Sequence, residues 1–273
     1  MNGEDLIPKE IFKKIVDNGS SKTSINIIKL LILSLLAGIY ISFGGELYIM
    51  ATQDLNIGTS FSQFLGGSVF SVGLMLVVIC GGELFTGNSL LIIPLLSKRI
   101  NFKGFIKNLS TVFLGNLLGS IFFAFLIYFS GVYKFNNMDW GYRAIIIANS
   151  KVNLSFLEAL FKGILCNILV CLAIWMAFGS KNIISKIFAI YFPIMAFVMS
   201  GFEHSVANMF LIPLGIILKN NQFLASKLIN INTTNLNWLS FFIKNLIPVT
   251  VGNIIGGMFF VGFLYYLVYS DIK

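Results

Sequence analysis

Few side chains in this sequence could carry chemistry, because ionisable residues are scarce inside its long apolar segments. His204 is the only histidine, and it follows Glu203 in the segment SGFEHSVAN. Imidazole titrates near neutral pH, so His204 could donate a hydrogen bond to a small anion or exchange a proton with it. A second segment, GGELFTGN, contains Glu83 and Thr86. We interpret the two glutamates as structural residues that accept hydrogen bonds from backbone N–H groups freed at helix breaks.

The other buried polar side chains are neutral or have a simpler explanation. Asn167 and Asn253 add amide donors within apolar segments. Glu158 and Lys162 are four residues apart with the acid first, which favours a pairing on one helix face. A lone histidine without a nearby cysteine argues against a metal centre, and the three cysteines form no disulfide framework. We expect no cofactor, no metal and no enzymatic activity.

The elements that position these residues must lie in lipid. Only 11% of the 273 residues are charged, whereas 57% are hydrophobic. A soluble domain carries about 25% charged residues, so this composition excludes a soluble enzyme, a nucleic-acid binder and a disordered chain. A bilayer core about 30 Å thick needs roughly 20 apolar residues per helix. Six segments meet this length: 25–50, 61–97, 105–131, 155–178, 184–218 and 240–270.

The distribution of Lys and Arg predicts the orientation. These residues concentrate in the amino-terminal segment and in the connections on the same side, so both termini are expected in the cytoplasm of a multi-pass inner-membrane protein. Residues 1–24 form a separate amphipathic segment, because apolar residues recur at helical spacing among lysines. This segment is expected either to anchor at the membrane surface or to cover the cytoplasmic mouth of a pore.

The chain contains a hidden repeat within one transmembrane domain, residues 25–270. Segments 61–97 and 184–218 are too long for one crossing, and each contains an interruption in which Glu precedes Asn by five residues. The third and sixth segments share GNLLGS and GNIIGG. Residues 25–131 and 155–270 therefore indicate two three-helix copies that enter the membrane in opposite senses. Broken helices at membrane depth are tolerated where they line a cavity.

Four motifs carry a resemblance to a known family. GGELFTGN, GFEHSVANMF, GILCNILVCLAIWMAFG and NLIPVTVGNIIGG occur in this order, and together they resemble the formate/nitrite transporter family. The resemblance implies an all-α, aquaporin-like fold with two inverted halves and broken second and fifth helices. It also implies homopentamers with one pore per protomer. Such proteins pass small monovalent anions such as formate, nitrite or hydrosulfide, often together with a proton.

The resemblance also assigns roles to residues of this chain. His204 matches the central histidine and Glu203 its neighbour, while Lys151 matches a vestibule lysine that attracts the anion. The remaining matches are the pore residues Thr86, Asn167 and Asn253, and the apolar constrictions Leu74, Phe85 and Phe197 with Phe70 and Leu84 close to them. Lys162 has no counterpart in this pattern. Formate is the expected substrate, with hydrosulfide and nitrite left open. A neutral-solute, aquaporin-like pore is the alternative from another class, although the paired Asn-Pro-Ala motif is missing.

Overall fold

The computed structural model describes residues 5–53 and 58–270, and the regular structure in these ranges is helical. The helices before the first interruption are α1 (Pro8–Ser24), α2 (Ile27–Thr52) and α3 (Thr59–Cys80). They are followed by a 3₁₀ helix η1 (Gly87–Leu91), α4 (Ile92–Leu96), α5 (Phe102–Ser130), α6 (Asp139–Val152), α7 (Phe156–Gly179), α8 (Ile183–Met199) and α9 (Ser205–Leu218). The last helical rod joins α10 (Trp238–Ser240), α11 (Ile247–Ile254) and α12 (Leu264–Tyr269) through π-helical stretches over Phe241–Leu246 and Ile255–Phe263.

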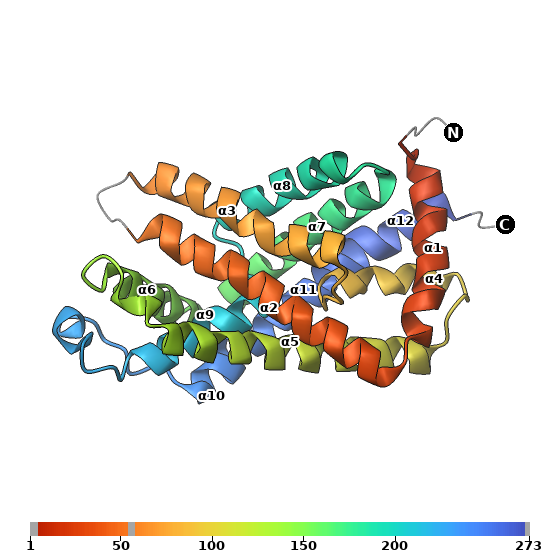
Figure 1. Cartoon of the computed structure of the whole chain (residues 1–273). Helices are drawn as coiled ribbons and strands as arrows, with labels where there is room; N and C mark the ends of the chain where they lie inside the picture. The colour runs from red at the N-terminus through yellow and green to blue at the C-terminus, as the bar shows by residue number, and fades with distance from the viewer. Residues whose placement is uncertain (1–4, 54–57, 271–273) are drawn as a thin grey trace.

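The long helices form one elongated bundle (Figure 1). Within the described residues, five helical rods are long and apolar enough to cross a membrane: α2, α3, α5, α7 and the rod Trp238–Tyr269. The apolar helices α8 and α9 are shorter, and α6 is a helix that the sequence analysis did not anticipate. Large side chains on the outer faces of these rods are exposed, for example Phe129 on α5 and Phe161 on α7. Apolar side chains at such positions are typical of a lipid-facing surface, so the chain is an all-helical membrane protein.

Glycines allow the rods to approach one another closely. A Cβ atom at Gly119 of α5 would collide with the carbonyl of Leu35 on α2, and one at Gly256 of the last rod would collide with the carbonyl of Ile164 on α7. Small residues at these places let membrane helices pack backbone to backbone. The motifs GNLLGS and GNIIGG therefore act, at least in part, as packing surfaces.

The chain leaves the helical path twice inside the bundle. After α3, Gly81 has a φ of 87°, and after α8, Gly201 has a φ of 68°. A side chain is disfavoured in this left-handed region, which explains glycine at both turns. The chain then runs without α-helix until η1 in the first case and α9 in the second. These are the two interruptions that the sequence placed in segments 61–97 and 184–218.

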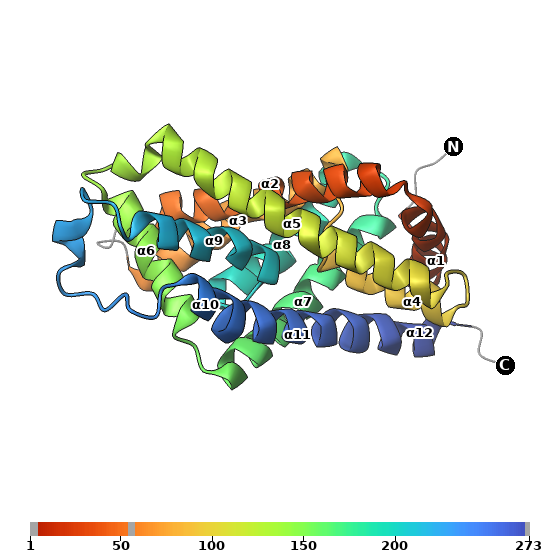
Figure 2. The ribbon, with the colours of Figure 1, turned by 90° about the horizontal axis from the view of Figure 1, so that it is seen from below.

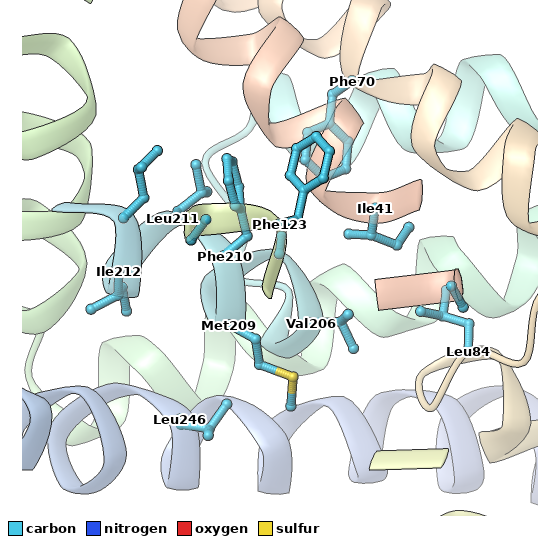
Figure 3. Close-up of a cluster of buried hydrophobic side chains, with 14 of the residues drawn as sticks. Ile41, Phe70, Leu84, Phe123, Val206, Met209, Phe210, Leu211, Ile212 and Leu246 are labelled. Carbon is cyan, nitrogen blue, oxygen red and sulfur yellow. The ribbon is translucent and has the colours of Figure 1, made fainter. Parts of the chain in front are cut away.

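The core lies between the rods and around α9. Met209 and Phe210 are fully buried, and Figure 3 shows them among Phe123, Leu246 and Val206. All residues of α9 except one are buried, so this short helix is enclosed by the other elements. It is held rigidly at the point where the second interruption ends.

Helix α1 crosses one end of the bundle beside α4 and α12, whereas α6 lies at the other end (Figures 1 and 2). Its apolar face is buried against the protein itself: Phe12 contacts the rings of Tyr266 and Tyr269, and Ile11 and Ile15 belong to the same cluster as Trp175. This packing uses the apolar face that a membrane-surface anchor would need for lipid.

Candidate functional site

The two interruptions meet at one hydrogen bond. The Thr86 Oγ1 and the His204 Nε2 are 2.9 Å apart, and both side chains are buried. His204 is also the N-cap of α9, where its Nδ1 accepts a hydrogen bond from the backbone N–H of Ala207 at 3.1 Å. Because Nδ1 accepts, the neutral ring carries its proton on Nε2 and donates it towards Thr86. The ring stacks beside Phe197 at 5.9 Å between centroids.

Two asparagines hold the interruptions in shape. The Asn116 amide donates to the carbonyls of Ser34 at 2.7 Å and Glu83 at 2.9 Å, and its Oδ1 accepts from the backbone N–H of Phe85 at 2.9 Å. Asn116 was not identified from the sequence, although it occupies the Asn of GNLLGS just as Asn253 occupies that of GNIIGG. The repeat of this motif was the sequence signal that could have identified Asn116.

Asn253 repeats this arrangement at the second interruption. Its amide donates to the carbonyls of Gly163 at 2.8 Å and Glu203 at 3.0 Å, and its Oδ1 accepts from Ser205 N–H at 2.9 Å. The Asn167 amide donates to the carbonyl of Asn253 at 2.7 Å, with longer contacts to the Thr86 carbonyl and to Ser89. The predicted pore amides are thus occupied by protein acceptors in this structure.

The two glutamates bind side chains, which corrects the expectation that they accept freed backbone N–H groups. The Glu83 carboxylate accepts from Lys22 Nζ at 2.9 Å and from Asn88 Nδ2 at 2.8 Å. Asn88 also donates to Asn108 Oδ1 at 2.8 Å. The freed N–H groups donate instead to asparagine Oδ1 atoms, as at Phe85, and to backbone carbonyls, as at Glu83 and Glu203.

A matching cluster surrounds the other glutamate. The Lys151 Nζ lies 2.7 Å from Glu203 Oε1, and Asn208 Nδ2 donates to Glu203 Oε2 at 2.6 Å. Asn208 also donates to Asn245 Oδ1 at 2.8 Å, and Asn245 donates to the Lys151 carbonyl. A buried carboxylate requires such compensation. The predicted vestibule lysine is therefore an ion-pair partner and not a free cation.

A small apolar chamber touches the histidine. It has a volume of about 10 Å³, roughly the space for one water molecule. Its lining residues are His204 and the apolar side chains Ile41, Phe70, Leu74, Leu84, Val170, Ile194 and Phe197. Four of the five predicted constriction residues are in this lining. Phe85 is not, because its ring packs edge-on against Phe113 at 5.0 Å between centroids.

Three lining residues were missed by sequence reasoning. Ile41, Val170 and Ile194 are ordinary apolar residues of spanning segments, so no sequence signal separates them from the lipid-facing or core residues around them.

Two larger cavities open on opposite sides of the chamber. The α1 cavity has a volume of about 370 Å³ and is bounded by Lys14, Lys22, Glu83, Leu84 and Lys186, among others. The α6 cavity has a volume of about 380 Å³ and is lined by Arg143, Lys151, Lys162, Glu203, His204 and Phe197, among others. Leu84 borders both the α1 cavity and the chamber, while His204 borders the chamber and the α6 cavity. The three spaces lie in series and are separated by a few side chains.

Glu158 caps its own helix and, more weakly, interacts electrostatically with Lys162. The Glu158 carboxylate accepts from the Ser155 backbone N–H at 2.8 Å and from its hydroxyl at 2.7 Å. Lys162 lies one turn further along α7 and lines the α6 cavity. Within residues 5–53 and 58–270, no group of three or more His, Cys, Asp or Glu side chains is placed to hold a metal ion.

Comparisons with known proteins agree on one family. The family model described as formate/nitrite transporter matches residues 9–267. The formate channel FocA of Escherichia coli strain K12 is 38% identical over 97% of this chain and 94% of that protein. A probable formate transporter of Methanothermobacter thermautotrophicus is 41% identical over 88% of this chain and 89% of that protein.

Solved structures give the same result. A pentameric formate channel with formate bound has a TM-score of 0.81 and 38% identity, covering 89% of this chain and 97% of the other. An ion channel of the FNT family has a TM-score of 0.82 and 30% identity, covering 95% and 98%. These relatives are named as channels or transporters, which is consistent with a protein that is not an enzyme.

Proposed function

Since the chain belongs to the formate/nitrite transporter family, we propose that it is a channel for small monovalent anions, with formate as its principal substrate. The observation that carries this proposal is the series of spaces from the α1 cavity through the chamber to the α6 cavity, with His204 bordering the last two. A pore of this kind offers polar, positively charged vestibules on both sides of an apolar barrier.

The architecture is proposed to consist of two inverted halves with six spans. The second span comprises α3, η1 and α4, the fifth comprises α8 and α9, and α2, α5, α7 and the last rod supply the others. The paired clamps of Asn116 and Asn253 support this duplication. Helices α1 and α12 share one end of the bundle, and the lysine distribution assigns that end to the cytoplasm. A homopentamer follows from the likeness to a pentameric formate channel.

The anion is proposed to enter from the α6 cavity and to cross the chamber as a neutral acid. A carboxylate loses most of its hydration in an apolar constriction and pays a large free-energy cost, whereas the protonated acid does not. The Nε2–H of His204 donates towards Thr86 when no anion is bound, and it can donate instead to the carboxylate of an entering anion. Formate would then take up one proton from water, either directly or relayed by the imidazole, which would receive one proton as it passes one on, and would release it on the far side.

Lys151 contributes differently from the sequence-based expectation. Its charge is balanced by Glu203, so attraction of the anion falls to the whole α6 cavity, including Arg143 and Lys162. Glu203 keeps Lys151 in place beside the histidine. Thr86, Asn167 and Asn253 are proposed to support the permeation path by fixing its backbone.

Stopped-flow flux in proteoliposomes tests the proposal. Formate, nitrite, hydrosulfide and lactate are supplied as matched gradients while internal pH is recorded, with glycerol as the neutral solute. Formate should enter fastest and acidify the lumen, because the acid carries its proton inwards. Faster hydrosulfide or nitrite entry would reassign the substrate within the family. Rapid glycerol entry without anion flux would support the aquaporin-like alternative and refute an anion channel.

A further inference from the structure

The α1 cavity carries more positive charge than its own acid can balance. Its lining includes Lys14, Lys22 and Lys186 but one carboxylate, Glu83, and this carboxylate is already paired with Lys22 at 2.9 Å. Lys14 and Lys186 reach the cavity from two different helices, α1 and α8. A cavity with low-dielectric walls and charges of one sign concentrates counter-ions.

The ammonium groups around Lys14 lie close enough to repel one another. Its Nζ donates to the carbonyl of Phe178 at 3.0 Å and lies 5.9 Å from that ring centroid. Partial burial, followed by the charges of Lys186 and Lys181, lowers the pKa of Lys14. Lys181 lies in the connection between α7 and α8 and does not line the cavity, but its charge acts on Lys14. Three cations from three elements therefore converge on one place.

Acids on α1 do not relieve this repulsion. Asp17 pairs with Arg99 at 3.3 Å, and Glu10 accepts from the backbone N–H of Ile7 at the start of its own helix. Lys14 and Lys186 therefore line a half-open cavity without a carboxylate partner among its lining residues, since Glu83 is paired with Lys22.

We propose that the α1 cavity is a binding site for a phosphate-bearing polyanion, held by Lys14 and Lys186, which closes the pore from this side. Lysine ammonium groups bind phosphate oxygens as point charges. A polyanion cannot become neutral by accepting one proton, so it cannot cross the apolar chamber beyond Leu84. Bound between α1 and α8, it would hold α1 across the entrance.

The size and charge of the site favour a polyanion over the transported anion. The cavity of about 370 Å³ is far larger than the chamber of about 10 Å³. One monovalent anion would balance only one of the unpaired ammonium groups, whereas a diphosphate satisfies both and bridges the two helices.

Pyrophosphate is the probe for a direct binding test. The purified full-length protein, in nanodiscs of phosphatidylcholine, is titrated by calorimetry and by its thermal stability. The double variant Lys14→Gln, Lys186→Gln should bind pyrophosphate about tenfold more weakly, since two charge-assisted contacts are lost. The control Lys103→Gln, Lys107→Gln removes the same charge from exposed positions on α5 that do not line the cavity. The control should bind like the wild type, and equal loss in both double variants would overturn the site.

A second arm separates a lipid headgroup from a soluble anion. If the phosphate groups come from lipid, nanodiscs that contain cardiolipin, which carries two phosphate groups, should stabilise the wild type and the control but not the cavity variant, and should weaken pyrophosphate binding. If the anion is soluble, the lipid exchange should leave the difference between variants unchanged. Absence of any difference between the cavity variant and its control, in both lipids, refutes the proposal.

The third arm measures the block itself. Pyrophosphate is added to membrane vesicles with the cytoplasmic face outwards and to vesicles of the opposite orientation, and formate uptake is followed. Uptake should fall only in the first preparation and should persist in the cavity variant. Equal inhibition on both sides would overturn the closing role. The binding arms need no transport, so they remain decisive even if formate proves not to be the substrate.

Discussion

The two interruptions follow the same path through the molecule but carry different chemistry. Each begins at a glycine with positive φ, Gly81 or Gly201, and each is tied by an asparagine clamp. Each glutamate, Glu83 or Glu203, is paired with a lysine. The duplicated features are therefore those that shape the backbone.

The residues that follow the glutamates break this likeness. Leu84 occupies the position in the first interruption that His204 occupies in the second, and both border the chamber. Thr86 corresponds to Val206, and only Thr86 meets the imidazole. The scaffold that positions the backbone thus occurs at both interruptions, whereas the titratable side chain, His204, occurs at only one of them. His204 contacts one hydroxyl, that of Thr86 from the other interruption, and it lines the α6 cavity but not the α1 cavity.

The largest expected effect concerns the shared scaffold. Asn116→Ala and Asn253→Ala should each destabilise the fold by about 3 kcal/mol, because three buried hydrogen bonds are lost and backbone groups remain unpaired. Unfolding of the purified variants by denaturant measures this. The two losses should be similar. A large loss for one and none for the other would show that the two clamps are not equivalent.

The next effect concerns the single titratable group. His204→Leu gives the second interruption the residue of the first, and should lower formate flux by about ten- to a hundredfold through loss of one buried donor. It should also flatten the pH dependence of flux in proteoliposomes. Leu84→His is the reciprocal variant, and it should not restore transport in the His204→Leu background, since Val206 offers no hydroxyl there. An unchanged pH profile in His204→Leu would remove the histidine from the mechanism.

Thr86→Val tests the partner of the histidine. Loss of the hydroxyl should reduce formate flux about fivefold, in line with one neutral hydrogen bond of about 1 kcal/mol. The matched control, Val206→Thr, adds a hydroxyl at the corresponding position and should leave flux unchanged. Similar effects from both variants would mean that packing, and not the contact with His204, accounts for the change.

The smallest expected effect comes from Lys162. Lys162→Leu should raise the half-saturating formate concentration for uptake two- to threefold, because a cation lining the α6 cavity contributes to steering that salt screens. In this variant, the half-saturating formate concentration should also depend less on ionic strength. Lys244→Leu removes a lysine that is exposed and lines neither cavity. An identical response of both variants would exclude a local role for Lys162.

Sequence reasoning singled out the two interruptions, and it named His204 and four of the apolar residues that line the same chamber, because these follow from broken apolar runs and from motif order. It failed where contacts join distant segments. The ion pairs of Lys22 with Glu83 and of Lys151 with Glu203 link residues on different elements, and nothing in the local pattern specifies either partner. Phe85 lies outside the chamber lining, against Phe113 of another helix, and the local sequence gives no sign of that contact.

Helix α6 was missed for a related reason. It carries Arg143 and Lys151 and walls a cavity, as α1 does with Lys14 and Lys22, yet it is too short and polar to register as a membrane span. Each of these two short helices directly precedes the first long helix of a predicted copy, α2 or α7. The correspondence between α1 and α6 is apparent only in the structure, where Lys22 of α1 pairs with Glu83 and Lys151 of α6 pairs with Glu203.

The burial of α1 has a consequence for the order in which the chain is assembled. Helix α1 is synthesised before the rings that receive Phe12, which belong to Tyr266 and Tyr269 of α12, and before Trp175 of the same cluster. The apolar face of α1 therefore has none of these partners until α12 has been inserted. Docking of α1, and with it assembly of the cationic wall of the α1 cavity, depends on insertion of α12.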